Sequence, residues 1–270
     1  MRPNIIDRVN PAVALAIAGS DSGGAAGLQA DLKTFAMHGV FGTSVLTVLT
    51  AQNSAEIRQI APVPAEFVAA QLSAVLDDLP VAAVKTGMLA TLETITTVAE
   101  WAPRLPQLVV DPVLVSTTGT RLFTREAELA YLELLFPHAA VATPNMREAS
   151  VLLDRTVSTV EEAVAAAGEL AQYGPKCIVI KGGQRRGKAE AVDVVWRDGQ
   201  IELLRSPWIE TANIHGSGDA FGATIASGLA RGRPVEEALA MAKAYVHDAL
   251  SRSATWTLGG GHGPLGWPVR

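Results

Sequence analysis

The sequence predicts an α/β fold in which helices cover both faces of a mostly parallel central sheet. Three observations support this prediction. Short, continuous apolar segments recur along the chain, most of them are followed by a segment with helical periodicity, and an Asp-Gly pair separates two further strand-like segments. Uninterrupted apolar strands that alternate with amphipathic helices are typical of parallel sheets buried on both faces.

The apolar segments are too short to be helices, and glycine or polar residues bound them. Both features favour strands. They cover residues 13–18, 45–49, 81–84, 108–110, 141–143 and 178–180. The predicted helices cover residues 28–38, 65–76, 92–101, 125–135, 160–172, 223–229 and 235–250.

An antiparallel hairpin is predicted at one edge of the sheet. Residues 191–196 and 201–205 flank a turn that contains Asp198 and Gly199, and Asp-Gly is a strong signal for a tight hairpin turn. The sequence contains neither a linker-like stretch, nor a repeat of fixed period, nor a shift in composition. We therefore predict a single domain over residues 1–270.

Composition excludes several classes of function. The net charge of −5 argues against a surface for nucleic acid or an anionic membrane, because both need clustered Lys and Arg. No segment approaches the roughly 20 apolar residues of a membrane-spanning helix. Cys177 is the single cysteine, which rules out an internal disulfide and a cysteine metal cluster and suits a reducing cytoplasm. We expect a cytoplasmic protein that binds neither nucleic acid nor membrane.

Two local features have competing interpretations. Residues 12–18 are apolar like a short secretory signal, but Asp7 interrupts the basic region that such a signal needs, so a first strand is preferred. Arg185, Arg186 and Lys188 lie beside glycines and fit either a solvated turn or a loop on the phosphate side of a ligand.

Glycine and polar residues gather directly after the predicted strands. In a parallel α/β sheet, ligands bind outside the carboxyl ends of the strands. Turn geometry alone explains any one such loop, but a whole series at one sheet edge favours a binding site. The segments are residues 19–27, 50–53, 85–88, 111–113, 144–148 and 181–183.

The strongest single signal is Gly216-Ser217-Gly218-Asp219, which leads into an apolar helical run. Glycines let backbone N–H groups approach a ligand, and a helix start favours an anion, so this loop is a candidate phosphate cradle. Asp219 can cap the helix or accept the proton of a substrate hydroxyl during phosphoryl transfer. Neither a Gly-x-x-x-x-Gly-Lys-Ser/Thr loop nor a Gly-x-Gly-x-x-Gly fingerprint follows the first strand.

Asn145 and Glu148 also have two interpretations. They follow a predicted strand and begin a helix, where they can form a capping box. The same amide and carboxylate suit a hydrated Mg²⁺, which takes few protein ligands.

Taken in order, these loops resemble one family. The matching segments are 19–24, 27–35, Thr50-Ala51-Gln52-Asn53, Lys85-Thr86-Gly87-Met88-Leu89, Asp111-Pro112-Val113, Thr143-Pro144-Asn145 with Glu148, and Lys181-Gly182-Gly183. They are similar to the hydroxymethylpyrimidine/phosphomethylpyrimidine kinases of thiamine biosynthesis, in the ribokinase superfamily, from about residue 13 to Pro264.

The resemblance implies a ribokinase-like three-layer α/β/α fold, ATP and Mg²⁺ as cofactors, and a homodimer. It implies phosphorylation of the hydroxymethyl group of 4-amino-5-hydroxymethyl-2-methylpyrimidine, and also of the resulting monophosphate to the diphosphate.

The resemblance also implies roles for individual residues. The pyrimidine pocket would be lined by Asp31, Gln52 and Met88, with Val113 nearby. The nucleotide would be bound by Lys181, Asn145 and Gly183, and Mg²⁺ and the phosphates by Glu148 and Asp111. The transferred phosphoryl group would be stabilised by Gly216, Ser217 and Gly218, beside the base Asp219. The Gln52 amide offers both an acceptor and donors to a ring nitrogen and its neighbouring amino group.

One position departs from the family pattern, in which the glycine loop typically ends in Cys rather than Asp219. A carboxylate is a ready base for an alcohol, whereas a phosphomonoester needs no base and would be repelled. We hypothesise that phosphorylation of the alcohol outweighs phosphorylation of the monophosphate.

Two alternatives stay open. A pyridoxal kinase also phosphorylates a hydroxymethyl group on a six-membered nitrogen ring, and related enzymes carry Asp in this loop. A non-catalytic small-molecule binding protein of the same fold is the second alternative.

Overall fold

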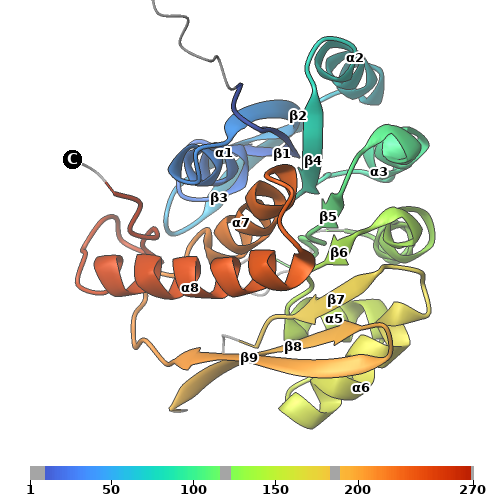
Figure 1. The fold of residues 1–270 in the computed structure, drawn as a ribbon. Coiled ribbons are helices and arrows are strands. Elements are labelled where there is room, and N and C mark those ends of the chain that lie inside the picture. Colours follow the sequence, from blue (N-terminus) through green and yellow to red (C-terminus); the bar gives the residue numbers. More distant parts are fainter. Residues whose placement is uncertain (1–9, 116–122, 183–188, 269–270) are drawn as a thin grey trace, which may run out of the picture.

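The computed structural model describes residues 10–115, 123–182 and 189–268. In these residues nine strands form one sheet in the order β3-β2-β1-β4-β5-β6-β7-β8-β9 (Figure 1). The strands are β1 (Val13–Asp21), β2 (Phe41–Gln52), β3 (Ile57–Pro62), β4 (Val81–Thr86), β5 (Leu108–Val110), β6 (Val141–Ala142), β7 (Cys177–Ile180), β8 (Glu190–Arg197) and β9 (Gln200–Pro207).

The helices connect the strands and cover the sheet. They are α1 (Gly27–Met37), α2 (Ala65–Leu76), α3 (Leu92–Trp101), α4 (Arg125–Ala130), α5 (Met146–Leu153), α6 (Val160–Ala171), α7 (Ser217–Ala230) and α8 (Val235–Ser253). None of these described helices is both long and apolar enough to cross a membrane.

The predicted parallel sheet is confirmed. β2, β1, β4, β5, β6 and β7 pair in parallel, so their carboxyl ends meet at one edge. The predicted hairpin is also confirmed, because β8 pairs antiparallel with β7 and with β9. At its turn Asp198 and Gly199 have φ values of 50° and 78°, the positive values that a type I′ turn requires at both central positions.

Two elements differ from the prediction. β3 pairs antiparallel with β2 and was not predicted, because all of its residues are exposed and it ends in Pro62, so it lacks a buried pattern. The helix predicted over residues 125–135 is α-helical only to Ala130, and Tyr131–Leu135 continue as a π-helical turn.

Alternating side chains of β1 divide the interior into two cores. Leu15 and Ile17 pack in one core, which also contains residues of α2, α3, α5 and α6. Ala14, Ala16 and Ala18 face the other core, with residues of α1, α7 and α8. Figure 1 shows these two groups of helices on opposite faces of the sheet. The predicted three-layer α/β/α arrangement is therefore confirmed.

Leu72 on α2 tests the packing of this helix against the sheet. Its side chain is 0% exposed, so Leu72→Ala leaves a cavity and is expected to lower the free energy of unfolding by about 2–5 kcal/mol. Phe67 on the same helix is 59% exposed, and Phe67→Ala is expected to change it by less than about 0.5 kcal/mol. Urea denaturation of both variants makes the comparison, and equal losses would contradict this packing.

Candidate active site

Lys85 lies at the centre of the polar groups at the carboxyl edge of the sheet. It stands on β4 and is fully buried. Its Nζ donates to both carboxylate oxygens of Asp31 on α1, at 2.7 and 2.9 Å, and to Oδ1 of Asp219 on α7, at 3.1 Å. One ammonium group therefore joins a strand to two helices.

The charge of Lys85 is held by its neighbours. Burial lowers the pKa of Lys85, but the carboxylates of Asp31, Asp219 and Asp111 outweigh burial and raise the pKa above its ordinary value. Lys85 is thus a fixed cation. The side chain of Asp219 is 16% exposed while that of Asp31 is 0% exposed, so of its two partners only Asp219 reaches the surface of the site.

Two glycines leave room for the Lys85 side chain. A Cβ at Gly87 would lie 3.3 Å from Nζ of Lys85, and a Cβ at Gly222 would lie 3.2 Å from its Cε. Both distances are tighter than ordinary van der Waals contact. Glycine at these positions allows β4 and α7 to approach each other around the ammonium group.

A second ion pair lies further along the same edge of the sheet. Lys181 follows β7, and its Nζ donates to Oδ1 of Asp111, which follows β5, at 2.8 Å. Thr143, which follows β6 between them, donates its hydroxyl to the same oxygen at 3.1 Å. A Cβ at Gly218 would lie 3.3 Å from Nζ of Lys181 and 3.8 Å from Oδ2 of Asp111. The glycine loop therefore faces this second pair.

The glycine loop turns sharply into α7. Gly216 has φ 84°, and a Cβ there would lie 1.8 Å from the backbone oxygen of Ala25, so only glycine fits. The N–H of Ser217 donates to the oxygen of Ile214 at 3.1 Å. The first N–H groups of a helix lack intrahelical acceptors. Since the Ser217 amide is used within the turn, Gly218 carries the amide best placed for an anion beside Lys181.

Asn145 and Glu148 form the capping box of α5. Asn145 Oδ1 accepts from the N–H of Glu148 at 3.0 Å, and Glu148 Oε2 accepts from the N–H of Asn145 at 2.8 Å. Glu148 is buried, and burial raises its pKa to about 8; Lys181 opposes this shift and Asp111 adds to it. The structural interpretation of the pair is realised, and a metal role would have to use the remaining carboxylate oxygen.

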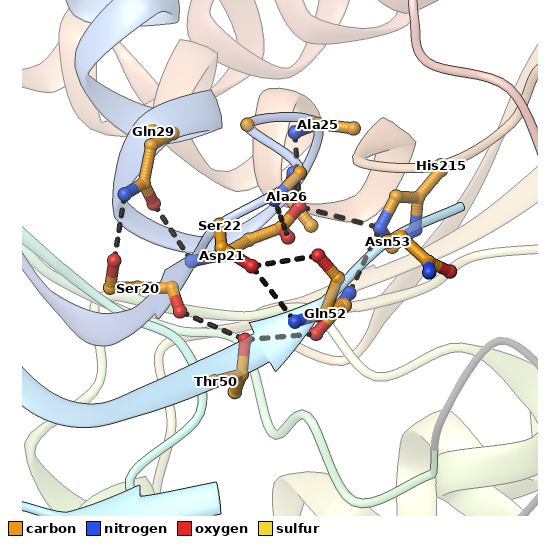
Figure 2. A network of polar contacts seen from close by, with 12 residues as sticks. Ser20, Asp21, Ser22, Ala25, Ala26, Gln29, Thr50, Gln52, Asn53 and His215 are labelled. Carbon is orange, nitrogen blue, oxygen red and sulfur yellow. Dashed lines mark hydrogen bonds and ion pairs between the residues drawn. The ribbon is translucent and has the colours of Figure 1, made fainter. Parts of the chain in front are cut away.

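Gln52 belongs to a separate polar network after β1 and β2 (Figure 2). Its Nε2 lies 3.1 Å from Nε2 of His215, and its Oε1 accepts from the hydroxyl of Thr50 at 3.2 Å. Asp21 Oδ2 lies 3.5 Å from the same His215 nitrogen. Gln52 is therefore connected to the residue that precedes the glycine loop.

The other predicted pocket residues are more dispersed. Met88 and Val113 are partly exposed and follow β4 and β5, whereas Gln52 ends β2. β1 and β4 lie between β2 and β5, so the sheet itself does not bring Val113 next to Gln52. The Asp31 carboxylate is buried on Lys85, which removes it from the surface of any pocket.

Gly183 lies outside the described residues, as do Arg185, Arg186 and Lys188. Among the described residues, no group of three or more His, Cys, Asp or Glu side chains gathers as metal ligands.

Sequence reasoning assigned no role to Lys85, Asp21 or His215. Lys85 had a signal, because a lysine within the apolar strand Val81–Thr86 must find a counter-charge inside the protein. Asp21 and His215 had none beyond their place in the loops, since their partners lie on segments far away in the sequence.

Comparison with solved structures identifies the class of protein. The chain is 37% identical to Bacillus subtilis pyridoxal kinase, whose ADP complex it matches with a TM-score of 0.88 over 95% of this chain and 97% of that one. It is 34% identical to a phosphomethylpyrimidine kinase from Clostridium difficile 630, with a TM-score of 0.78 over 88% of this chain and 99% of that one. The fold is ribokinase-like, and the protein is an ATP-dependent small-molecule kinase.

Comparison with sequences identifies the family. The chain is 44% identical over 256 residues to a hydroxymethylpyrimidine/phosphomethylpyrimidine kinase of Rhizobium meliloti (strain 1021), which is 94% of this chain and 96% of the relative. Residues 21–266 match the family model described as phosphomethylpyrimidine kinase. The chain belongs to the phosphomethylpyrimidine kinase family.

Glu148 is expected to make stability depend on pH. Its folded pKa of about 8 lies above the ordinary value of 4.5, so the folded state holds more protons between these values and loses stability as pH rises through them. Glu148→Gln removes this group. The free energy of unfolding of both proteins is measured by urea denaturation without metal. Between about pH 4.5 and 8, the value for the wild type should fall relative to that for Glu148→Gln. A constant difference would contradict the raised pKa.

Proposed function

We propose that this protein transfers a phosphoryl group from ATP to the hydroxymethyl group of 4-amino-5-hydroxymethyl-2-methylpyrimidine, a step of thiamine biosynthesis. The observation that carries the proposal is the Asp219 carboxylate, which reaches the surface of the site at the start of α7 and is held by Lys85 at 3.1 Å. Family membership and a relative named for this activity support the choice of substrate.

The chain's own groups divide the work. Oδ1 of Asp219 is bound to Lys85, which leaves Oδ2 to accept the proton of the acceptor hydroxyl. The amide of Gly218 and the start of α7 favour the negative charge of the phosphoryl group. Lys181, paired with Asp111, supplies a cation on the same side of the glycine loop.

Asp111 and Glu148 fit a magnesium ion that is held mainly by nucleotide phosphates. Burial raises the pKa of Glu148 and the nearby Asp111 raises it further, and a cation bound beside Glu148 would relieve this repulsion. Two carboxylates with several waters are an ordinary protein contribution to a Mg²⁺ site. When bound, Mg²⁺ would neutralise charge on the transferring phosphoryl group.

Gln52 and its neighbours support recognition of an aminopyrimidine. The amide offers an acceptor and a donor at one edge, which matches an amino group beside a ring nitrogen. We include Met88 and Val113 in the pocket on the family resemblance. We propose that Asp31 holds Lys85 in place beside Asp219.

Pyridoxal is the second candidate substrate, because the solved pyridoxal kinase from Bacillus subtilis shares the fold with a TM-score of 0.88. Pyridoxal lacks the amino group that suits the Gln52 amide. The purified protein assayed with both alcohols separates the candidates, and a higher kcat/KM for pyridoxal would favour the second.

The homodimer that the family resemblance implies and the cytoplasmic location that the single cysteine suits belong to this proposal as well. Sedimentation of the purified protein tests the homodimer.

Asp219→Asn tests the proposed base. The amide keeps the size of the side chain but cannot accept the proton as a carboxylate does, so kcat for the aminopyrimidine alcohol is expected to fall about 10²–10⁴-fold. The measurement is ADP release with Mg·ATP, with thermal unfolding as the control for folding. Turnover equal to wild type would refute the role of Asp219.

Asp219→Cys tests the effect of the extra carboxylate on substrate choice. The wild type is expected to phosphorylate the alcohol faster than its monophosphate, because the carboxylate repels a doubly charged acceptor. Replacing it with a mostly neutral thiol should raise the ratio of monophosphate to alcohol turnover. Steady-state kinetics on both acceptors give this ratio, and an unchanged or lower ratio would contradict the electrostatic argument.

A further inference from the structure

The amide of Gln52 is held at both of its polar atoms. The Thr50 hydroxyl, which shares its proton with the backbone oxygen of Ser20 at 3.0 Å, contacts Oε1 at 3.2 Å, and His215 Nε2 contacts the amide nitrogen at 3.1 Å (Figure 2). An amide N–H₂ only donates, so in this arrangement Nε2 of His215 is the acceptor and the imidazole carries its proton on Nδ1. The hydrogen bond thus ties the tautomer of His215 to the direction of the amide, so that one determines the other.

His215 is itself held by the backbone on each side. Its N–H donates to the oxygen of Gly263 at 3.1 Å, and its oxygen accepts from the N–H of Leu265 at 3.3 Å. The side chain is only 13% exposed. The imidazole is therefore a fixed point against which the partly exposed side chain of Gln52 can be oriented.

Asp21 places a fixed anion on the other side of this imidazole nitrogen. Its carboxylate accepts the N–H groups of Gly23, Ala25 and Ala26 at 2.7, 3.0 and 2.9 Å. Although burial raises the pKa of Asp21, its hydrogen bonds outweigh burial and lower the pKa; they come from His215, when its proton is on Nε2, and from these three amides. Oδ2 lies 3.5 Å from Nε2 of His215, so the anion would attract a proton to that nitrogen.

The position of the His215 proton is coupled to the direction of the Gln52 amide. When Nε2 is unprotonated, it accepts from the amide nitrogen. When Nε2 carries a proton, the amide must turn by about 180° to bring Oε1 towards it, and the N–H₂ group then meets Thr50 Oγ1. Without the imidazole, neither direction is enforced from this side.

The direction matters for recognition. An amide pairs with an amino group beside a ring nitrogen only when Oε1 faces the amino group and Nε2 faces the ring nitrogen. A turned amide sets donor against donor and acceptor against acceptor, which leaves polar groups of the complex unsatisfied.

We propose that His215 is a positioning residue that fixes the direction of the Gln52 amide and thereby sets the preference of the site for an acceptor with an amino group beside a ring nitrogen. The inference rests on the proposed function, because it assumes that Gln52 contacts the acceptor ring. Asp21 orients the imidazole, and Thr50 receives the opposite end of the amide.

The test compares His215→Leu, Gln52→Leu and the double variant on two acceptors, the aminopyrimidine alcohol and its analogue without the 4-amino group. For the aminopyrimidine, His215→Leu is expected to raise KM about tenfold or more, corresponding to loss of one oriented hydrogen-bonded pair, with a smaller change in kcat. For the analogue, the change should be less than about twofold. In the Gln52→Leu background, His215→Leu should add no further loss, because residues that act as one unit are not additive.

Two further variants separate positioning from folding. His215→Gln restores a polar atom near the place of Nε2 and should recover most of the preference. His38→Leu removes another histidine that hydrogen-bonds a hydroxyl, Thr224 Oγ1 at 3.0 Å, and should leave the preference unchanged. An equal loss with both acceptors in His215→Leu, or full additivity with Gln52→Leu, would overturn the inference.

A measurement without turnover keeps the inference distinct from the proposed function. The side-chain amide signals of Gln52, identified in NMR spectra by their loss in Gln52→Leu, should shift and exchange faster with solvent in His215→Leu. Unchanged signals would overturn the inference even if the aminopyrimidine is the substrate. If the wild type does not phosphorylate the aminopyrimidine, the proposed function fails. The single and double variants of His215 and Gln52 are then compared on the alcohol that is phosphorylated. If their losses of activity on that alcohol add up, the inference is overturned.

Discussion

The buried ammonium of Lys85 constrains the rest of the site. An unpaired charge inside a protein costs several kcal/mol, so β4 can carry Lys85 only if α1 and α7 keep Asp31 and Asp219 within hydrogen-bonding distance. Because Asp219 lies in the first turn of α7, the ion pair ties the start of this helix to Lys85. The start of α7 in turn places Gly218 against Lys181 and Asp111, so the two ion pairs and the glycine loop form one arrangement rather than three independent features.

The layers of the fold follow from the local pattern of the sequence. Small and large apolar residues alternate along β1, so one strand already specifies two different cores, with Ala16 towards α7 and Ile17 towards the opposite helices. The positions of the loops follow as well, because parallel strands bring their carboxyl ends to one edge whatever the loops contain. β3 could not be predicted in this way, since an exposed edge strand carries no apolar pattern.

The pairings within the site were not predictable from the local pattern. Lys85 meets Asp31 across 54 residues and Asp219 across 134 residues, and Gln52 meets His215 across 163 residues. No periodicity or spacing links such positions, so the sequence supplied candidate side chains without their partners. Asp31 shows the consequence: the family resemblance implied contact with the pyrimidine, and its 0% exposure shows a carboxylate committed to Lys85.

The shared use of Lys85 also explains how the site tolerates a carboxylate at position 219. A Lys85–Asp31 pair alone is neutral, so a thiol in place of Asp219 would leave a neutral cluster. With Asp219 present, one ammonium group serves two carboxyl groups, and burial raises the pKa of Asp31 to about 8, against the effect of Lys85 and with a further contribution from Asp219. Lys85 does not cancel the field of the Asp219 carboxylate, because the same ammonium group is shared with Asp31. The field of Asp219, the carboxylate that reaches the surface of the site, therefore acts where an acceptor must approach, and it acts differently on an uncharged alcohol and on a phosphomonoester.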